Sequence, residues 1–223
     1  MKRNQLLLLL TLVLFVAMVT LYFGPHGNLR YCLAYPAAVL TLGSLFVSPW
    51  PLTLALLACT VGDVMGILGS LSGQMGGFAV AHVFFIVLLR RGIVHQHLCL
   101  RLWVSVAAIE LVSWIVIGCL VAPTIPSVPL KIGCMAYAAL LLTVFGLAVI
   151  AALARRQAGK AMSVSVASML AAVAVVGAGL FVFSDFVLAW NLFVEQVSHA
   201  RYYIMCTYYA ALLLLFIALR REE

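Results

Sequence analysis

The sequence predicts an all-α integral membrane protein, a compact bundle of eight transmembrane helices in one polytopic domain that covers residues 1–223. Composition is the first observation behind this prediction: 66% of the 223 residues are hydrophobic and 9% are charged, whereas a soluble domain carries about 25% charged residues. The second observation is that apolar runs of about 20 residues, the length of a membrane-spanning helix, recur along the chain. The third is that basic residues lie in the gaps between these runs.

The apolar runs define the expected helices in chain order. The first run resembles a signal peptide, but it is too long and lacks small residues at a cleavage position, so we expect it to stay as a helix. Glycine, proline and charged residues separate the runs, and the short gaps make consecutive helices antiparallel neighbours. The expected helices cover about residues 5–23, 31–48, 51–69, 74–90, 99–121, 130–152, 166–190 and 203–219. The short gaps between them are 24–28, 49–51, 69–73, 90–98 and 122–129, with longer gaps on both sides of the seventh run.

The distribution of lysine and arginine predicts the orientation of the bundle. With eight spans both termini lie on the same side, and the side with more basic residues is the cytoplasmic one. The termini and the fourth and sixth gaps hold Lys2, Arg3, Arg90, Arg91, Arg101, Arg155, Arg156, Lys160, Arg220 and Arg221. The other side holds Arg30, Lys131 and Arg201. We therefore expect both termini in the cytoplasm of a multi-pass protein of the cell membrane, the inner membrane if the source is bacterial.

The net charge of +7 does not indicate a nucleic-acid partner, because that function needs basic residues gathered on one soluble face. The cysteines are scattered singly, which favours small buried apolar residues over a disulfide framework or a zinc site. A single histidine inside a span is also too few for zinc. We expect no cofactor and no metal. The cysteines are Cys32, Cys59, Cys99, Cys119, Cys134 and Cys206.

Three carboxylates, Asp63, Glu110 and Asp185, lie inside the expected helices. An ionised carboxylate at the centre of a transmembrane helix costs about 2.5–3.5 kcal/mol, so such a residue either pairs with a buried donor or serves a function. Asp63 and Asp185 lie about 8–9 Å inside the outer ends of spans three and seven, at 1.5 Å per residue. By the same rule His82 lies about 12 Å inside span four, and Thr207 to Tyr209 lie about 6–9 Å inside span eight.

A buried histidine or tyrosine alone is ordinarily a core or interface residue, but a common depth with two carboxylates favours one site. Small residues flank both carboxylates and either permit close helix packing or leave room for a ligand. They are Gly62, Gly66, Gly177 and Gly179. Gly62-Asp63 and Ser184-Asp185 also occupy equivalent places in two four-helix halves, which suggests a parallel repeat.

These motifs resemble the YhhN-like membrane proteins, which include the TMEM86 lysoplasmalogenases, over most of the chain. The matching segments are Gly62-Asp63, Ala81-His82, Gly177-Ala178-Gly179-Leu180-Phe181-Val182-Phe183-Ser184-Asp185 with Leu188-Ala189-Trp190-Asn191, and Thr207-Tyr208-Tyr209. The last two are the most specific. The chain departs from the family pattern at Tyr35, where a lysine commonly precedes the proline, at Leu212 in place of a glutamine, and at Phe85 in place of a tyrosine. Without the lysine, a phosphate head group loses a charged partner.

The resemblance implies hydrolysis of the vinyl ether of a lysoplasmalogen to a fatty aldehyde and a glycerophospho-alcohol. This reaction begins with protonation of the alkenyl carbon and passes through an oxocarbenium ion, so it needs one protonated acid and one ionised carboxylate, which two aspartates in an apolar site supply. We favour Asp185 as the acid and Asp63 as the base that activates water, although the sequence leaves the reverse assignment open. The predicted catalytic residues are completed by His82 and Tyr208, and the predicted substrate-binding residues are Thr207, Tyr209, Asn191, Ser184 and Tyr35.

Two other functions stay open at this point. A small-solute or proton-coupled transporter also uses carboxylates and histidine inside the membrane, and Glu110, near the middle of span five, could extend a polar path. A transporter needs polar groups that reach both faces, and the predicted clustering at one depth argues against it. A non-catalytic scaffold would use the same residues only to hydrogen-bond helices together. The expected partners are a lysophospholipid and the bilayer, and the oligomeric state is not predicted.

Overall fold

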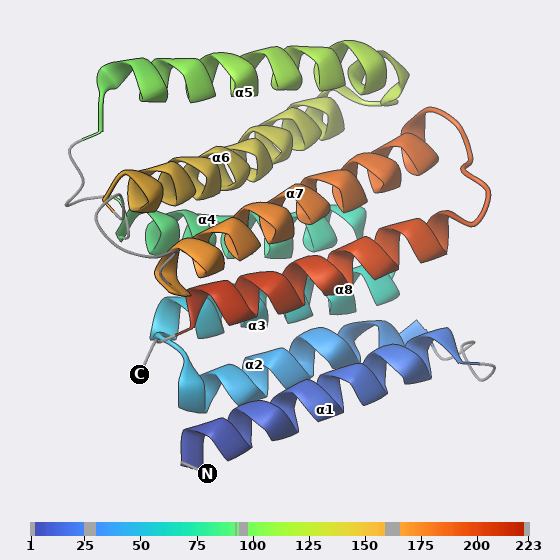
Figure 1. Cartoon of the computed structure of the whole chain (residues 1–223). Coiled ribbons are helices and arrows are strands. Elements are labelled where there is room, and N and C mark those ends of the chain that lie inside the picture. The colour runs from blue at the N-terminus through green and yellow to red at the C-terminus, as the bar shows by residue number, and fades with distance from the viewer. Residues whose placement is uncertain (1–2, 25–29, 92, 94–97, 159–165, 221–223) are drawn as a thin grey trace. The chain divides into compact units, whose positions relative to one another are not determined.

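The computed structural model describes residues 3–24, 30–91, 93, 98–158 and 166–220 (Figure 1). Within this part of the chain the structure is all-helical and contains eight α-helices, which confirms the predicted fold class. The chain divides into two compact units, Met1–Leu88 with Leu219–Glu223 and Leu89–Ala218. Each unit contains four α-helices in sequence order.

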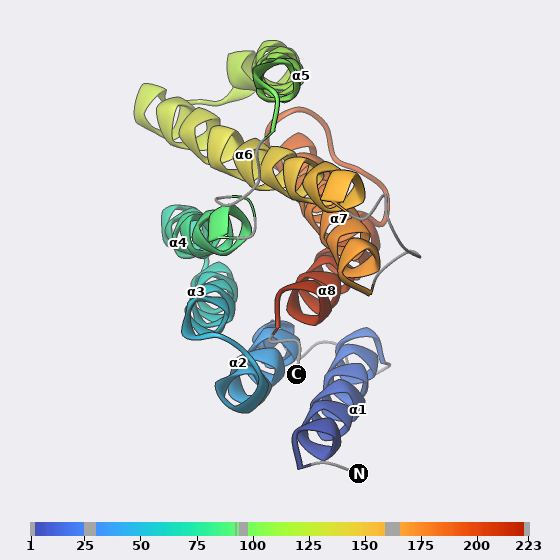
Figure 2. The same ribbon diagram turned by 60° about the vertical axis from the view of Figure 1, so that its left-hand side comes forward.

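The first unit contains the first four α-helices and a short 3-10 helix. Helix α1 packs against α2, and α2 packs against α3 (Figure 2). Hydroxyl groups join α2 to α3, because the side-chain oxygens of Thr41 and Thr60 lie 3.1 Å apart and Ser44 donates to Thr53 at 3.0 Å. The elements are α1 (Arg3–Phe23), η1 (Arg30–Ala34), α2 (Tyr35–Val47), α3 (Trp50–Ile67) and α4 (Leu71–Arg91).

Proline and glycine define the helix boundaries of this unit. Pro36 and Pro51 lie in the first turns of α2 and α3, where the missing N–H costs nothing. Gly69 follows α3 with φ of +77°, a backbone conformation that favours glycine. The Ser70 amide then donates to the Met65 carbonyl at 2.9 Å, and the helix ends as a Schellman motif. The chain can therefore turn at once into α4.

The second unit contains the last four α-helices and a second 3-10 helix. Helix α5 packs against α6, and α6 packs against α7. Trp114 on α5 donates its indole N–H to the Met135 carbonyl of α6 at 2.8 Å. Helices α7 and α8 meet at Gly177, where a Cβ would lie 3.1 Å from Leu214 Cβ. The elements are α5 (Leu100–Val121), η2 (Ala122–Thr124), α6 (Val128–Ala158), α7 (Val166–Phe193) and α8 (Ala200–Leu219).

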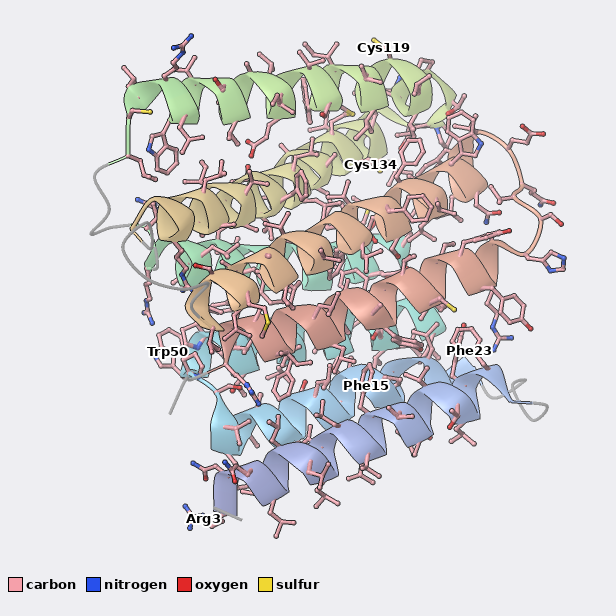
Figure 3. The ribbon with its side chains drawn as sticks, viewed as in Figure 1. Arg3, Phe15, Phe23, Trp50, Cys119 and Cys134 are labelled. Atoms are coloured by element: carbon pink, nitrogen blue, oxygen red, sulfur yellow. The ribbon has the colours of Figure 1, made fainter. Side chains whose placement is uncertain are left out.

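Seven of the described helices are long and apolar enough to cross a membrane, and the remaining one, Tyr31–Val47, is apolar but shorter. The chain is a polytopic membrane protein. Figure 3 shows Arg3 at the first turn of α1 and Phe23 at its last turn, so a charged end and an aromatic end bound this span. Lys2, Lys160, Arg221 and most of the gaps 24–28 and 90–98 lie outside the described residues. The cytoplasmic position of the termini stays a prediction.

The last three helices extend beyond their predicted ends. Helix α6 continues to Ala158 and includes Arg155, whereas hydropathy predicted its end at residue 152. Helix α7 ends at Phe193 and α8 begins at Ala200, each three residues beyond prediction. Hydropathy marks where the apolar layer ends, and a helix with good helix-forming residues continues past that point.

Candidate functional site

Helices α3 and α4 make backbone contact at Gly62 and Gly77. A Cβ on Gly77 would lie 2.6 Å from the Gly62 nitrogen and 3.0 Å from the Ala58 carbonyl oxygen. A Cβ on Gly62 would lie 3.2 Å from the Phe78 ring. Small residues at a spacing of four let two membrane helices approach this closely. The contact fixes α3 against α4 beside Asp63, the next residue on α3.

Asp63 and His82, two of the predicted catalytic residues, belong to this helix pair and are both buried. His82 Nδ1 lies 2.5 Å from the Phe78 carbonyl oxygen. A carbonyl oxygen only accepts a hydrogen bond, so His82 donates from Nδ1, and when the ring is neutral its lone pair is on Nε2. Phe85 packs edge-on against His82 with ring centroids 6.3 Å apart. The histidine is therefore held in a tautomer that accepts a proton at Nε2.

Tyr35 is the first residue of α2, where the 3-10 helix passes into the α-helix. Its side chain is exposed, while the following Pro36 is buried. The side chain is thus accessible at the predicted outer end of this span, and contact with a substrate stays a prediction.

Asp185 on α7 accepts a hydrogen bond from the Tyr137 hydroxyl of α6 through its Oδ2 atom. Tyr137 is a residue that sequence reasoning did not select. It lies nine residues from the start of α6, or about 13–14 Å along the helix axis. Asp185 lies eight residues before the end of α7, and Tyr208 lies eight residues after the start of α8. Each is therefore about 12 Å from the helix end at the α7–α8 loop. Applying the depth rule to tyrosines of span six would have found Tyr137.

The neighbours of Asp185 join α7 to α8. Ser184 is buried and donates its hydroxyl to the Ile204 carbonyl at 3.0 Å. Phe181, one turn before Asp185, packs edge-on against Tyr208 with ring centroids 5.5 Å apart. In the second unit Asp185 is therefore joined to α6 through Tyr137, and the same turn of α7 is joined to α8 through Ser184 and Phe181.

Three other predicted binding residues have local structural contacts in the second unit. Asn191 Oδ1 accepts the Val197 amide at 2.9 Å and closes the loop between α7 and α8. Thr207 donates its hydroxyl to the Tyr203 carbonyl at 2.6 Å. Tyr209 is buried with its ring centroid 5.5 Å from that of Tyr208. These contacts give the three side chains a structural role that needs no substrate. Their role in substrate binding stays a prediction.

In the first unit, the carboxylate and the histidine lie at different distances from their helix ends. Asp63 is four residues from the end of α3, or about 6 Å, and His82 is eleven residues from the start of α4, or about 16–17 Å. The predicted depth of His82, about 12 Å, is smaller than the observed one, because α4 begins at Leu71 rather than at the predicted residue 74. Tyr208 is deeper than predicted for the same reason, since α8 begins at Ala200.

Glu110, the third carboxylate of the apolar helices, lies on α5 against α6. The missing side chain of Gly146 on α6 leaves a notch, and the Glu110 Oε1 atom occupies it. Val106 borders this notch, 3.0 Å from the position that a Cβ on Gly146 would take. The notch lets a carboxylate lie against the backbone of a neighbouring helix. Within the described ranges, no three His, Cys, Asp or Glu residues gather in a group that could hold a metal ion.

The fold and these residues define a class: an α-helical polytopic membrane protein whose helices contain carboxylates, a histidine and tyrosines. Residues 31–219 match the YhhN family, and the chain belongs to that family. It is also 54% identical over 46 residues to the lysoplasmalogenase TMEM86B of Mus musculus and to that of Rattus norvegicus. The matched segment spans 21% of this chain and 20% of each relative. No solved structure matches the chain.

Proposed function

We propose that the protein is a lysoplasmalogenase-like ether hydrolase of the cell membrane. The observation that carries the proposal is a pair of aspartates inside apolar helices, Asp63 and Asp185, in a chain of the YhhN family. The resemblance to two proteins named lysoplasmalogenase supports it over one short segment. The substrate is a lysophospholipid with a vinyl ether at the first glycerol position, whose apolar chain reaches the protein through the bilayer.

In the first step Asp185 donates its proton to the alkenyl carbon that is not bonded to oxygen. The π electrons form the new C–H bond, and the carbon bonded to oxygen becomes an oxocarbenium carbon. The Asp185 carboxylate that results lies in an apolar environment, where it stabilises the cation strongly. This step is the difficult one, because it breaks the conjugation of the vinyl ether.

In the second step water adds to the oxocarbenium carbon while a base removes a proton from the water. Asp63 is the proposed base, and His82 is a proposed relay because its Nε2 atom carries the lone pair. The hemiacetal then collapses: its hydroxyl proton passes to the Asp185 carboxylate, the C–O bond to glycerol breaks, and the glycerol oxygen takes the proton held by Asp63. Both aspartates return to their starting states, and the products are an aldehyde and an alcohol.

Hydrolysis in D2O tests this reaction directly. The detergent-purified protein is given an alkenyl lysophospholipid, and a saturated alkyl analogue serves as the control because it has no carbon that the acid can protonate. We expect aldehyde from the alkenyl lipid alone, with one deuterium on the carbon next to the aldehyde. A parallel incubation of unlabelled aldehyde corrects for exchange after release.

An aldehyde without deuterium would contradict protonation at carbon. Cleavage of the alkyl analogue at the same rate would exclude the vinyl ether mechanism, and a folded protein without aldehyde release would refute the proposed function.

A further inference from the structure

The hydrogen bond from Tyr137 to Asp185 joins α6 to α7 within the second unit. Tyr137 is half-buried in an apolar helix, so its hydroxyl has little access to water and the carboxyl is a favourable acceptor. Ser184 and Phe181 hold the same turn of α7 against α8. Asp185 is therefore fixed from two sides, and Tyr137 contacts its reactive group directly.

A donated hydrogen bond distinguishes the two oxygens of Asp185. The carbonyl oxygen of a neutral carboxyl group accepts a hydrogen bond better than the hydroxyl oxygen does, so the hydrogen bond from Tyr137 favours Oδ2 as the carbonyl oxygen and Oδ1 as the oxygen that carries the acid proton. Oδ1 is then the atom that delivers the proton to a substrate. The hydrogen bond thus determines which oxygen carries the acid proton and fixes the orientation of the carboxyl group.

The same hydrogen bond also becomes stronger during the reaction. Before proton transfer Tyr137 donates to a neutral carboxyl group, and after transfer it donates to a carboxylate. Hydrogen bonds to charged acceptors are about twice as strong as those between neutral groups. An interaction that strengthens only as the transition state forms raises kcat and leaves substrate binding unchanged.

We propose that Tyr137 is a positioning residue that directs proton delivery from Asp185 Oδ1 and stabilises the carboxylate formed in the first step. This inference rests on the proposed vinyl ether hydrolysis and adds a residue outside the paired aspartates. Its role is indirect, since it acts through Asp185, to which it donates its hydrogen bond.

The Tyr137→Phe variant tests the inference by steady-state kinetics of aldehyde release. We expect kcat to fall about 10- to 100-fold, the range for losing one hydrogen bond to a charged group, while KM stays unchanged. In an Asp185→Asn background the same substitution should have no further effect on the residual rate, because the two residues act as a unit. The matched control is Tyr22→Phe, which removes the hydroxyl of a buried tyrosine on α1 and should leave kcat unchanged.

An infrared measurement gives a second reading that needs no substrate. The difference spectrum between the parent and Asp185→Asn identifies the carboxyl band of Asp185, and removal of the Tyr137 hydroxyl should move its carbonyl stretch to higher frequency. An unmoved band, an unchanged kcat, or a raised KM with intact kcat would each overturn the positioning role. Absence of aldehyde release by the parent would instead refute the proposed hydrolysis, so the two failures are distinguishable.

Discussion

Replacing Gly77 with alanine tests the close contact of α3 and α4 that carries Asp63 and His82. The added Cβ would lie 2.6 Å from the nitrogen and 2.7 Å from the Cα of Gly62. Carbon atoms in ordinary contact lie about 3.5–4.0 Å apart, so the two helices must separate locally by about 1 Å. The opposing atoms belong to the backbone, so no side-chain rotation relieves the collision.

The adjacent Gly76 provides a matched control on the same helix, because a Cβ there meets nothing within 4 Å. Alanine favours a helix over glycine by about 1 kcal/mol at either position. The difference between the two variants therefore isolates the collision, for which overpacking predicts about 1–3 kcal/mol. For a chain of this size 1 kcal/mol corresponds to about 2–4 °C in Tm, so Gly77→Ala should unfold about 2–12 °C below Gly76→Ala.

Thermal unfolding in one detergent, followed by helical circular dichroism, measures this difference. The same variants are assayed for aldehyde release, because a 1 Å displacement of a catalytic group costs about 100-fold in rate. Gly77→Ala should lose activity below its unfolding temperature, and Gly76→Ala should keep it. Equal Tm values for the two variants would refute the backbone contact between α3 and α4.

Two further predictions concern the contact of α5 with α6 and the loop before α5. Gly146→Ala should lower Tm, because the added Cβ collides with the Glu110 carboxylate and overpacking costs about 1–3 kcal/mol; adding Glu110→Ala should restore Tm by emptying the notch. Cys99, exposed at the start of α5, should react with a membrane-impermeant maleimide only in inside-out vesicles, because the distribution of basic residues predicts that this loop is cytoplasmic.

Each of these tests has a control on the same chain. If Glu110→Ala left the Tm of Gly146→Ala unchanged, the two residues would not share the notch. In the labelling test, Cys99→Ser should remove the signal, and Gln196→Cys in the exposed α7–α8 loop should label only in right-side-out vesicles. Labelling of Cys99 in right-side-out vesicles would place the termini outside.

The apolar runs predicted the eight helices because burial in lipid requires every backbone polar group to be satisfied within the helix. The helix ends were less predictable, since α6 continues past the apolar layer through Arg155. The first turns of the second span were also unpredicted, because the chain forms a 3-10 helix from Arg30 to Ala34 and leaves α2 with 13 residues.

The charged residues of the candidate site could be selected from the sequence. They are Asp63 and Asp185, which stand out because carboxylates are costly in a membrane helix. The apolar pattern alone did not single out Tyr137, since a tyrosine fits an apolar run without penalty; its depth in span six was the available signal, and its partner on α7 is 48 residues away. Asn191 was selected for its motif, and its contact with the Val197 amide depends on a loop geometry that the sequence does not encode locally.

The kinetics of aldehyde release by Asp63→Asn and Asp185→Asn test the paired-carboxylate mechanism most directly. Glu195→Gln, which removes an exposed carboxylate in the α7–α8 loop, is the control for loss of charge alone. We predict that each aspartate variant folds like the parent and loses about 100- to 10,000-fold in kcat, the contribution of a general acid or base. A folded aspartate variant that kept the parent's turnover would contradict the mechanism.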